Sequence, residues 1–211
     1  MGTSLGAHAL TRTLPAALIH WWKTDTGIAA ELAALTHAGA AITTAALGAD
    51  LLAALSRGED LDAAASHAQR TLASRDLPPL DLDLPHLVAL GSTSPGDVGI
   101  LRTLAKDATA PSALAGGVYA AVNVERRHVR DALLLAASAA DGGHAATVTG
   151  ALLGTIHGPD ALPIDWVARL ELTWPGDTLA RDLVQQVTEH PSGGEYTPAT
   201  DPDWLTRYPG A

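Results

Sequence analysis

A carboxylate and an imidazole lie three residues apart in a glycine-rich break, Asp141-Gly142-Gly143-His144. Apolar residues flank this break on both sides, so two buried helices are expected to meet there. A carboxylate oxygen and an imidazole nitrogen can both bind a metal ion or move a proton. The spacing indicates either a functional site at Asp141 and His144 or a helix–turn–helix corner in which Asp141 is a cap.

Two helical segments must position this break. Residues 132–140 are apolar nearly all round, which predicts a buried helix. The two glycines are expected to interrupt it, since glycine weakens a helix interior and permits a turn. A second helix is predicted from about Ala145 to Ile156. Gly150 and Gly154 share one face of it, where small residues let a neighbouring helix approach closely.

The composition predicts an all-α fold. Alanine is the commonest of the 211 residues, phenylalanine is absent, and few β-branched runs reach strand length. The length suggests a single domain with a substantial core. Asp25 is predicted to cap a helix. Further helices are predicted over residues 9–22, 28–35, 40–55, 61–73, 98–106, 112–121 and 177–190.

The charge pattern disfavours several classes of partner. Charged residues make up 17% of the chain and the formal net charge is −10, which suits neither nucleic acid nor an anionic membrane. The chain has no cysteine, so disulfides, a thiol nucleophile and thiolate metal sites are excluded. It shows no signal-peptide pattern and no apolar run long enough to span a bilayer. We expect a soluble, cytoplasmic protein.

The region around the break carries a recognisable signature. It contains Gly150-Ala151-Leu152-Leu153-Gly154, then Leu162-Pro163-x-x-Trp166 and Leu170-Glu171. This order resembles the C-terminal signature of the ADP-ribosylglycohydrolase family, which reads D-x-D-[ST], G-x-L-L-G, I-P-x-x-W and L-E. In that alignment Asp141 matches the first aspartate, whereas Gly143 replaces the second aspartate and His144 replaces the Ser/Thr.

The resemblance implies a compact all-α fold and hydrolysis of an ADP-ribosyl N- or O-glycoside. It also implies two Mg²⁺ ions between carboxylates of an early T-D-D motif and the late D-x-D-[ST] motif. Magnesium prefers hard oxygen ligands, and an imidazole suits it poorly. Asp141 is therefore the one implied metal ligand and catalytic carboxylate, and His144 is an implied ligand contact. Asp141 and His144 could alternatively hold a transition metal.

The N-terminal region carries further matches. Arg12-Thr13-Leu14-Pro15 matches an R-x-x-P element, and Gly6 aligns with the first glycine of the loop before it. In the family the backbone of this loop lies against the ribose and phosphate. Leu35-Thr36-His37 matches an L-T-H motif whose histidine lies at the pocket. The resemblance thus implies Gly6, Arg12, Thr36 and His37 as ligand-binding residues. His37 could instead be a histidine placed favourably at a helix C-terminus.

The match begins near the R-x-x-P element, so we expect that about the first third of the family domain is lacking. Residues 1–190 are predicted to form one domain, and residues 191–211 a tail docked on it through Trp204 and Tyr208.

Three functions are compatible with these patterns. The first is a truncated, catalytically degenerate family member that keeps part of an ADP-ribose pocket as a binding or regulatory module. The second is an active Mg²⁺-dependent hydrolase with a remodelled or partner-completed site. The third is a helical assembly protein on an old enzyme scaffold. Exposed apolar surface would then be covered by a second copy or a partner subunit. ADP-ribose or an ADP-ribosylated protein is the expected ligand in the first two.

Overall fold

A computed structural model describes residues 2–22, 27–194 and 196–208. Within these ranges the chain is all-helical, as predicted, with three isolated β-bridges. No helix in the described ranges is long and apolar enough to cross a membrane. The predicted cap at Asp25 lies outside the described residues.

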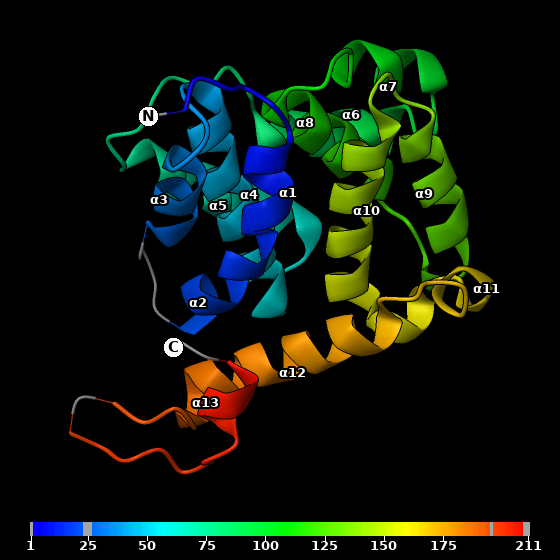
Figure 1. Ribbon diagram of the computed structural model, residues 1–211. Helices are drawn as coiled ribbons and strands as arrows, with labels where there is room; N and C mark the ends of the chain where they lie inside the picture. Colours follow the sequence, from blue (N-terminus) through cyan, green and yellow to red (C-terminus); the bar gives the residue numbers. More distant parts are fainter. Residues whose placement is uncertain (1, 23–26, 195, 209–211) are drawn as a thin grey trace. The chain divides into compact units, whose positions relative to one another are not determined.

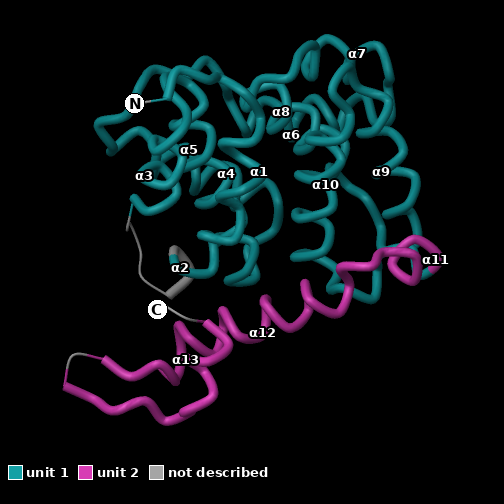
Figure 2. The backbone as a smooth tube through the Cα atoms, in the orientation of Figure 1, with its two compact units in different colours: residues 1–164 teal, residues 165–211 magenta. Residues whose placement is uncertain are grey.

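The chain divides into two compact units, residues 1–164 and 165–211 (Figure 2). The helices that begin in the first unit are α1 (His8–Thr13), α2 (Ala17–Trp22), α3 (Ile28–Ala34), α4 (Ala40–Ser56), α5 (Leu61–Ala73), α6 (Leu84–Thr93), α7 (Val98–Leu104), α8 (Ala110–Ala121), α9 (Val129–Ala137), α10 (Gly142–His157) and α11 (Ile164–Val167).

Helix α4 forms the centre of the first unit (Figure 1). Its residues from Ala41 to Leu55 are buried, with the exception of Ile42. Helices α1, α2, α3, α5, α8 and α10 all contact it, which explains why its sequence is mostly alanine and leucine. The buried Asp50 carboxylate accepts hydrogen bonds from the Arg75 guanidinium at 2.7 and 3.1 Å, so its charge is compensated.

Helices α8 and α10 approach each other at a glycine. A methyl group built on Gly117 would lie 2.5 Å from the Cβ of Val148, far closer than side chains normally pack. By contrast, a Cβ at Gly154 would meet nothing within 4 Å, and one at Gly150 would make an ordinary contact at 3.5 Å. The prediction that Gly150 and Gly154 permit the close approach is wrong, because the approach is made through Gly117.

The break between α9 and α10 falls before the two glycines. Helix α9 ends at Ala137 and α10 begins at Gly142, so the glycines lie in the first turn of α10 rather than interrupting a helix. A Cβ on Gly142 would lie 2.1 Å from the carbonyl oxygen of Ala137. Glycine is required here because the start of α10 lies against the end of α9.

Helix α9 is also less buried than predicted. Val129, Ala132 and Ala136 face the core, but Leu134 is 52% exposed. The helix packs against α8 and α10, and its remaining surface faces solvent. The prediction that this helix is buried on all sides is therefore wrong, and the helix that is buried on nearly all sides is α4.

The second unit contains α12 (Thr173–Glu189) and the short α13 (Trp204–Arg207). The C-terminal segment folds back on α12, because Asp182 accepts hydrogen bonds from Arg207 Nη1 at 2.8 Å and from the Tyr208 hydroxyl at 2.7 Å. These two bonds lower the pKa of Asp182, the Tyr208 hydroxyl more than Arg207. Trp204 is buried, and its ring centroid lies 5.3 Å from that of Tyr208. The expected division into residues 1–190 and a docked tail stays a prediction.

Candidate functional site

Main-chain hydrogen bonds fix the loop that contains Gly6. The carbonyl oxygen of Ser4 accepts from the amide of Ala38 at 3.0 Å, in the turn between α3 and α4. The carbonyl oxygen of Leu5 accepts from the amide of Ala110 at 3.1 Å, at the start of α8. The loop is thus fastened to two turns that are distant from it in the sequence.

Glycine at position 6 leaves room beside a buried imidazole. A Cβ there would lie 3.2 Å from Ser4 Oγ and 3.9 Å from Nε2 of His37. His37 lies in the α3–α4 turn and forms a parallel β-bridge with Ser4. The structure therefore places Gly6 and His37 side by side. The family resemblance implies that both residues belong to one ligand pocket.

Arg12, Thr36 and His37 form a hydrogen-bonded chain. Arg12 Nη2 donates to Thr36 Oγ1 at 2.6 Å, and Thr36 Oγ1 lies 2.8 Å from Nδ1 of His37. Because the threonine hydroxyl accepts from Arg12, its own hydrogen is available to Nδ1. With the hydroxyl donating to Nδ1, the proton of the neutral imidazole lies on Nε2, the nitrogen nearest Gly6.

The environment of His37 favours the neutral imidazole. Burial lowers the pKa of His37 most, and the positive charge of Arg12 and then that of His8 lower it further. The residue is 7% exposed. At neutral pH, His37 can therefore donate one hydrogen bond from Nε2 without carrying a charge.

A second cluster of side chains, made of His8, Asp141 and His144, lies at the start of α10. The rings of His8 and His144 meet edge to face, with their centroids 4.5 Å apart and their planes at 75°. His144 Nε2 lies 3.7 Å from the Asp141 carboxylate, which is longer than a hydrogen bond. Asp141 occupies the N-cap position of α10, but its side chain makes no capping hydrogen bond. The capping role proposed from the sequence is therefore not performed by its carboxylate.

His8 connects the two groups. It contacts His144 through its ring, and its charge acts on His37. It is the first residue of α1, and α1 contacts α10. No local signal in the sequence predicts the contact with His144, because the two residues are far apart along the chain and meet through helix packing.

Asp107 lies in a turn beside the Gly6 loop, and sequence patterns alone did not bring it out. Its Oδ1 accepts hydrogen bonds from the hydroxyls of Thr109 and Ser112, both at 2.6 Å, and from the amide of Thr109 at 3.1 Å. The Ser112 and Thr109 bonds lower the pKa of Asp107. This turn also forms an antiparallel bridge with Gly6. The spacing D-x-T-x-x-S, in which Thr109 caps α8, is the signal that identifies the turn.

The residues around Asp141 do not fit a two-magnesium centre. Among the described residues, no group of three or more His, Asp or Glu side chains could hold a metal ion. Gly143 supplies no side-chain oxygen, and a Cβ there would meet nothing within 4 Å. His144 offers nitrogen instead of the hard oxygen that Mg²⁺ prefers. The backbone thus has space for the second carboxylate of the motif, but a glycine occupies the position.

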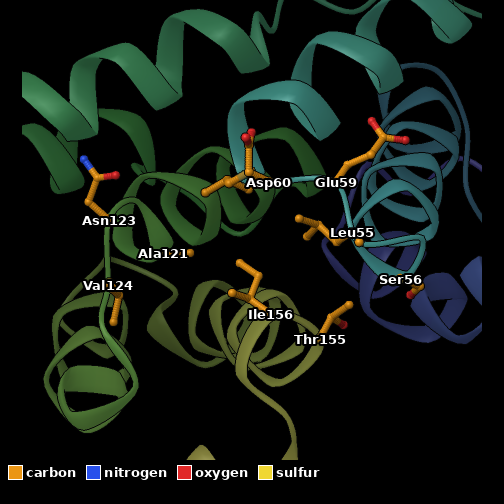
Figure 3. A pocket seen from close by; sticks show the side chains of 11 residues that line it. Leu55, Ser56, Glu59, Asp60, Ala121, Asn123, Val124, Thr155 and Ile156 are labelled. Atoms are coloured by element: carbon orange, nitrogen blue, oxygen red, sulfur yellow. The ribbon is translucent and has the colours of Figure 1, made fainter.

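A cavity of about 560 Å³ lies elsewhere in the first unit, at the C-terminal ends of α4, α8 and α10. Figure 3 shows Leu55, Ala121 and Ile156 around this space, with Glu59 and Asp60 along one side. None of the candidate site residues lines it.

The family described as ADP-ribosylglycohydrolase matches residues 1–193 of the 211-residue chain. No curated protein and no solved structure gave a significant match.

Proposed function

The chain belongs to the ADP-ribosylglycohydrolase family, and from this premise we propose that it binds an ADP-ribosyl group without the two-metal hydrolytic centre of the family. The observation that carries the proposal is the environment of Asp141. Its neighbour at 3.7 Å is an imidazole, and the position where the family has a second aspartate is Gly143. A single carboxylate cannot offset the charge of two Mg²⁺ ions.

The retained half of the pocket supplies the binding groups. A neutral His37 donates from Nε2 to an oxygen of the ligand, and its orientation is held by Thr36 and Arg12. The absence of a side chain at Gly6 leaves the loop backbone open to the ligand beside that donor. The exposed guanidinium of Arg12 adds a positive charge suited to the diphosphate. These groups support recognition without requiring a metal.

The test is calorimetric titration of ADP-ribose into the purified full chain, once with excess Mg²⁺ and once with EDTA. Equal affinity in both conditions supports a metal-independent binding module. Binding that requires Mg²⁺ would contradict the proposal and would favour a hydrolase with a remodelled site. Absence of binding at millimolar ligand would also contradict it and would favour an assembly protein.

A designed gain of function tests the altered ligand set directly. In the double variant Gly143→Asp/His144→Ser, the late motif of the family is restored at a position where a Cβ has open space. We expect Mg²⁺ binding by calorimetry to be stronger in this variant than in the natural chain, because two carboxylates then face the ion. The single variant His144→Ser is the matched control, since it adds no carboxylate.

Two further proposals concern the context of the protein. We propose a cytoplasmic location, and a second copy or partner subunit covering exposed apolar side chains such as Leu35, which is 73% exposed. Light scattering after size-exclusion chromatography measures the mass of the assembly; a monomer at micromolar concentration would exclude the homo-oligomer.

A further inference from the structure

The cavity at the C-terminal ends of α4, α8 and α10 has no role in the proposed ADP-ribose site. That site lies at the N-terminal end of α10, whereas the cavity is lined by Thr155 and Ile156 of its last turn. Binding in the cavity is therefore independent of the proposed function.

The walls of the cavity are fixed by the local structure. Helix α4 ends in a turn in which the amide of Gly58, at φ +89°, donates to the carbonyl oxygen of Leu55 at 2.9 Å. Asp60 then caps α5, accepting from the amide of Ala63 at 2.8 Å. Across the cavity, Nε2 of His157 donates to the carbonyl oxygen of Val124 at 2.7 Å. The hollow is thus built from three anchored segments and is preformed.

Apolar side chains form part of the cavity wall, polar side chains such as Ser56 and Asn123 form another part, and one side carries negative charge. Leu55, Ala121 and Ile156 come from three different helices and surround the same space (Figure 3). Ile156 is 40% exposed, a large fraction for a side chain that lines a hollow. Glu59 and Asp60 both line the cavity on the same side.

The helix ends reinforce this negative charge. Each helix C-terminus carries the equivalent of about half a negative charge on its free carbonyl groups. Helices α4, α8 and α10 all end at the cavity, whereas α5 begins there, and the positive end of α5 is offset by its Asp60 cap and by Asp62 in its first turn. Positive groups nearby are partly engaged elsewhere: Arg57 and His67 both contact Glu59, at 3.5 and 2.9 Å. Asp60 uses Oδ1 for its capping bond to the Ala63 amide, so its Oδ2 is the carboxylate oxygen available to a ligand.

We propose that this cavity binds a small organic cation, an amine or guanidine that carries an apolar group. The apolar group packs against Leu55, Ala121 and Ile156, and the cationic end lies toward Asp60 and the helix C-termini. Charge complementarity selects the cation over a neutral or anionic molecule of the same shape, and the apolar floor selects an organic cation over an inorganic one.

A matched ligand series tests the charge requirement. Cyclohexylmethylamine, cyclohexylmethanol and cyclohexanecarboxylate share one apolar group and differ in charge. Titration into the ¹⁵N-labelled full chain follows the amide signals of Gly58, Leu61 and Ile156. We expect these signals to shift with the amine at an affinity about threefold or more above that of the alcohol, and salt to reduce the difference.

Two variants and one control locate the site. Asp60→Asn keeps a good N-cap residue but removes the charge, so amine affinity should fall about two- to fivefold while alcohol affinity stays unchanged. Asp62→Asn, an exposed carboxylate in the first turn of α5 that does not line the cavity, is the control. Ile156→Trp fills the hollow and should remove the shifts caused by both ligands.

Three results would each overturn the proposal: an alcohol that binds as tightly as the amine, an effect of Asp60→Asn no larger than that of Asp62→Asn, or absence of amine-induced shifts at all three amides.

Discussion

The substitution His37→Ala separates a binding role of this residue from a structural one. The imidazole makes a hydrogen bond to Thr36 through Nδ1, and its Nε2 lies nearest Gly6. The loop that contains Gly6 is held by main-chain atoms, including the bond from the Ala38 amide to the Ser4 carbonyl. Truncating the side chain should therefore remove a ligand contact without releasing the loop.

The size of the effect follows from the hydrogen bonds that the imidazole makes. One uncharged hydrogen bond contributes about 0.5–1.5 kcal/mol, so the Kd for ADP-ribose should rise about two- to tenfold. The free energy of unfolding should fall by about 1–2 kcal/mol, because the ring is buried but the Thr36 hydroxyl keeps its bond from Arg12. The chain should remain folded, since its core around α4 does not include this side chain.

Calorimetry in EDTA measures the Kd, and urea unfolding measures stability on the same sample. His86→Ala, which removes an exposed histidine side chain from the first turn of α6, is the matched control. An unchanged Kd in a folded His37→Ala protein would refute the binding role. Loss of the folded state instead would show that His37 is structural, and the pocket assignment would then fail at its best-defined residue.

Three other predictions concern pH, catalysis and packing. Burial is the largest cause that lowers the pKa of His37 in the folded chain. The stabilising contribution of this histidine is therefore full above the unfolded pKa of about 6.5, and it is lost as the pH falls through the folded pKa. Acidification should lower the urea midpoint more in the natural chain than in His37→Ala. Asp141→Ala should abolish any Mg²⁺-dependent hydrolysis, and unchanged activity would mean that the resemblance misassigns this position. Gly117→Ala should destabilise the fold by about 1–3 kcal/mol through the contact with α10, whereas Gly154→Ala, which has open space, should stabilise it by about 0.5–1 kcal/mol in thermal unfolding.

Local signals in the sequence predicted several helices closely, but the single helix expected over residues 9–22 is divided into α1 and α2 by a 3₁₀ turn that contains Pro15. The helix expected over residues 61–73 has those bounds in the structure, with Asp60 as its cap, because an N-cap residue acts on amides only a few positions away. The long alanine and leucine segment at residues 40–55 is helix α4, which ends one residue later. The all-α class and the family were also predicted correctly, the latter from motifs in a shared order.

Features that depend on packing could not be predicted in this way. Both α4 and α9 are apolar in sequence, and only the surrounding helices decide that α4 is buried all round while α9 has a solvent face. Likewise, Gly117 and Gly154 are both helical glycines and the sequence does not distinguish them, but only Gly117 has the Val148 side chain packed against it. The contact between His8 and His144 has the same origin, since helices α1 and α10 bring them together.

The main-chain attachment of the Gly6 loop has a consequence for how this site can evolve. Amide and carbonyl groups are the same for nearly every amino acid, so bonds such as that from the Ala110 amide to the Leu5 carbonyl do not depend on which side chains the loop carries. Mutations can therefore alter the recognition surface of the loop while its path stays constant. Exposed positions such as Leu5 can change what the loop presents to a ligand while these bonds persist, whereas the buried Ala7 cannot be enlarged without a cost in stability.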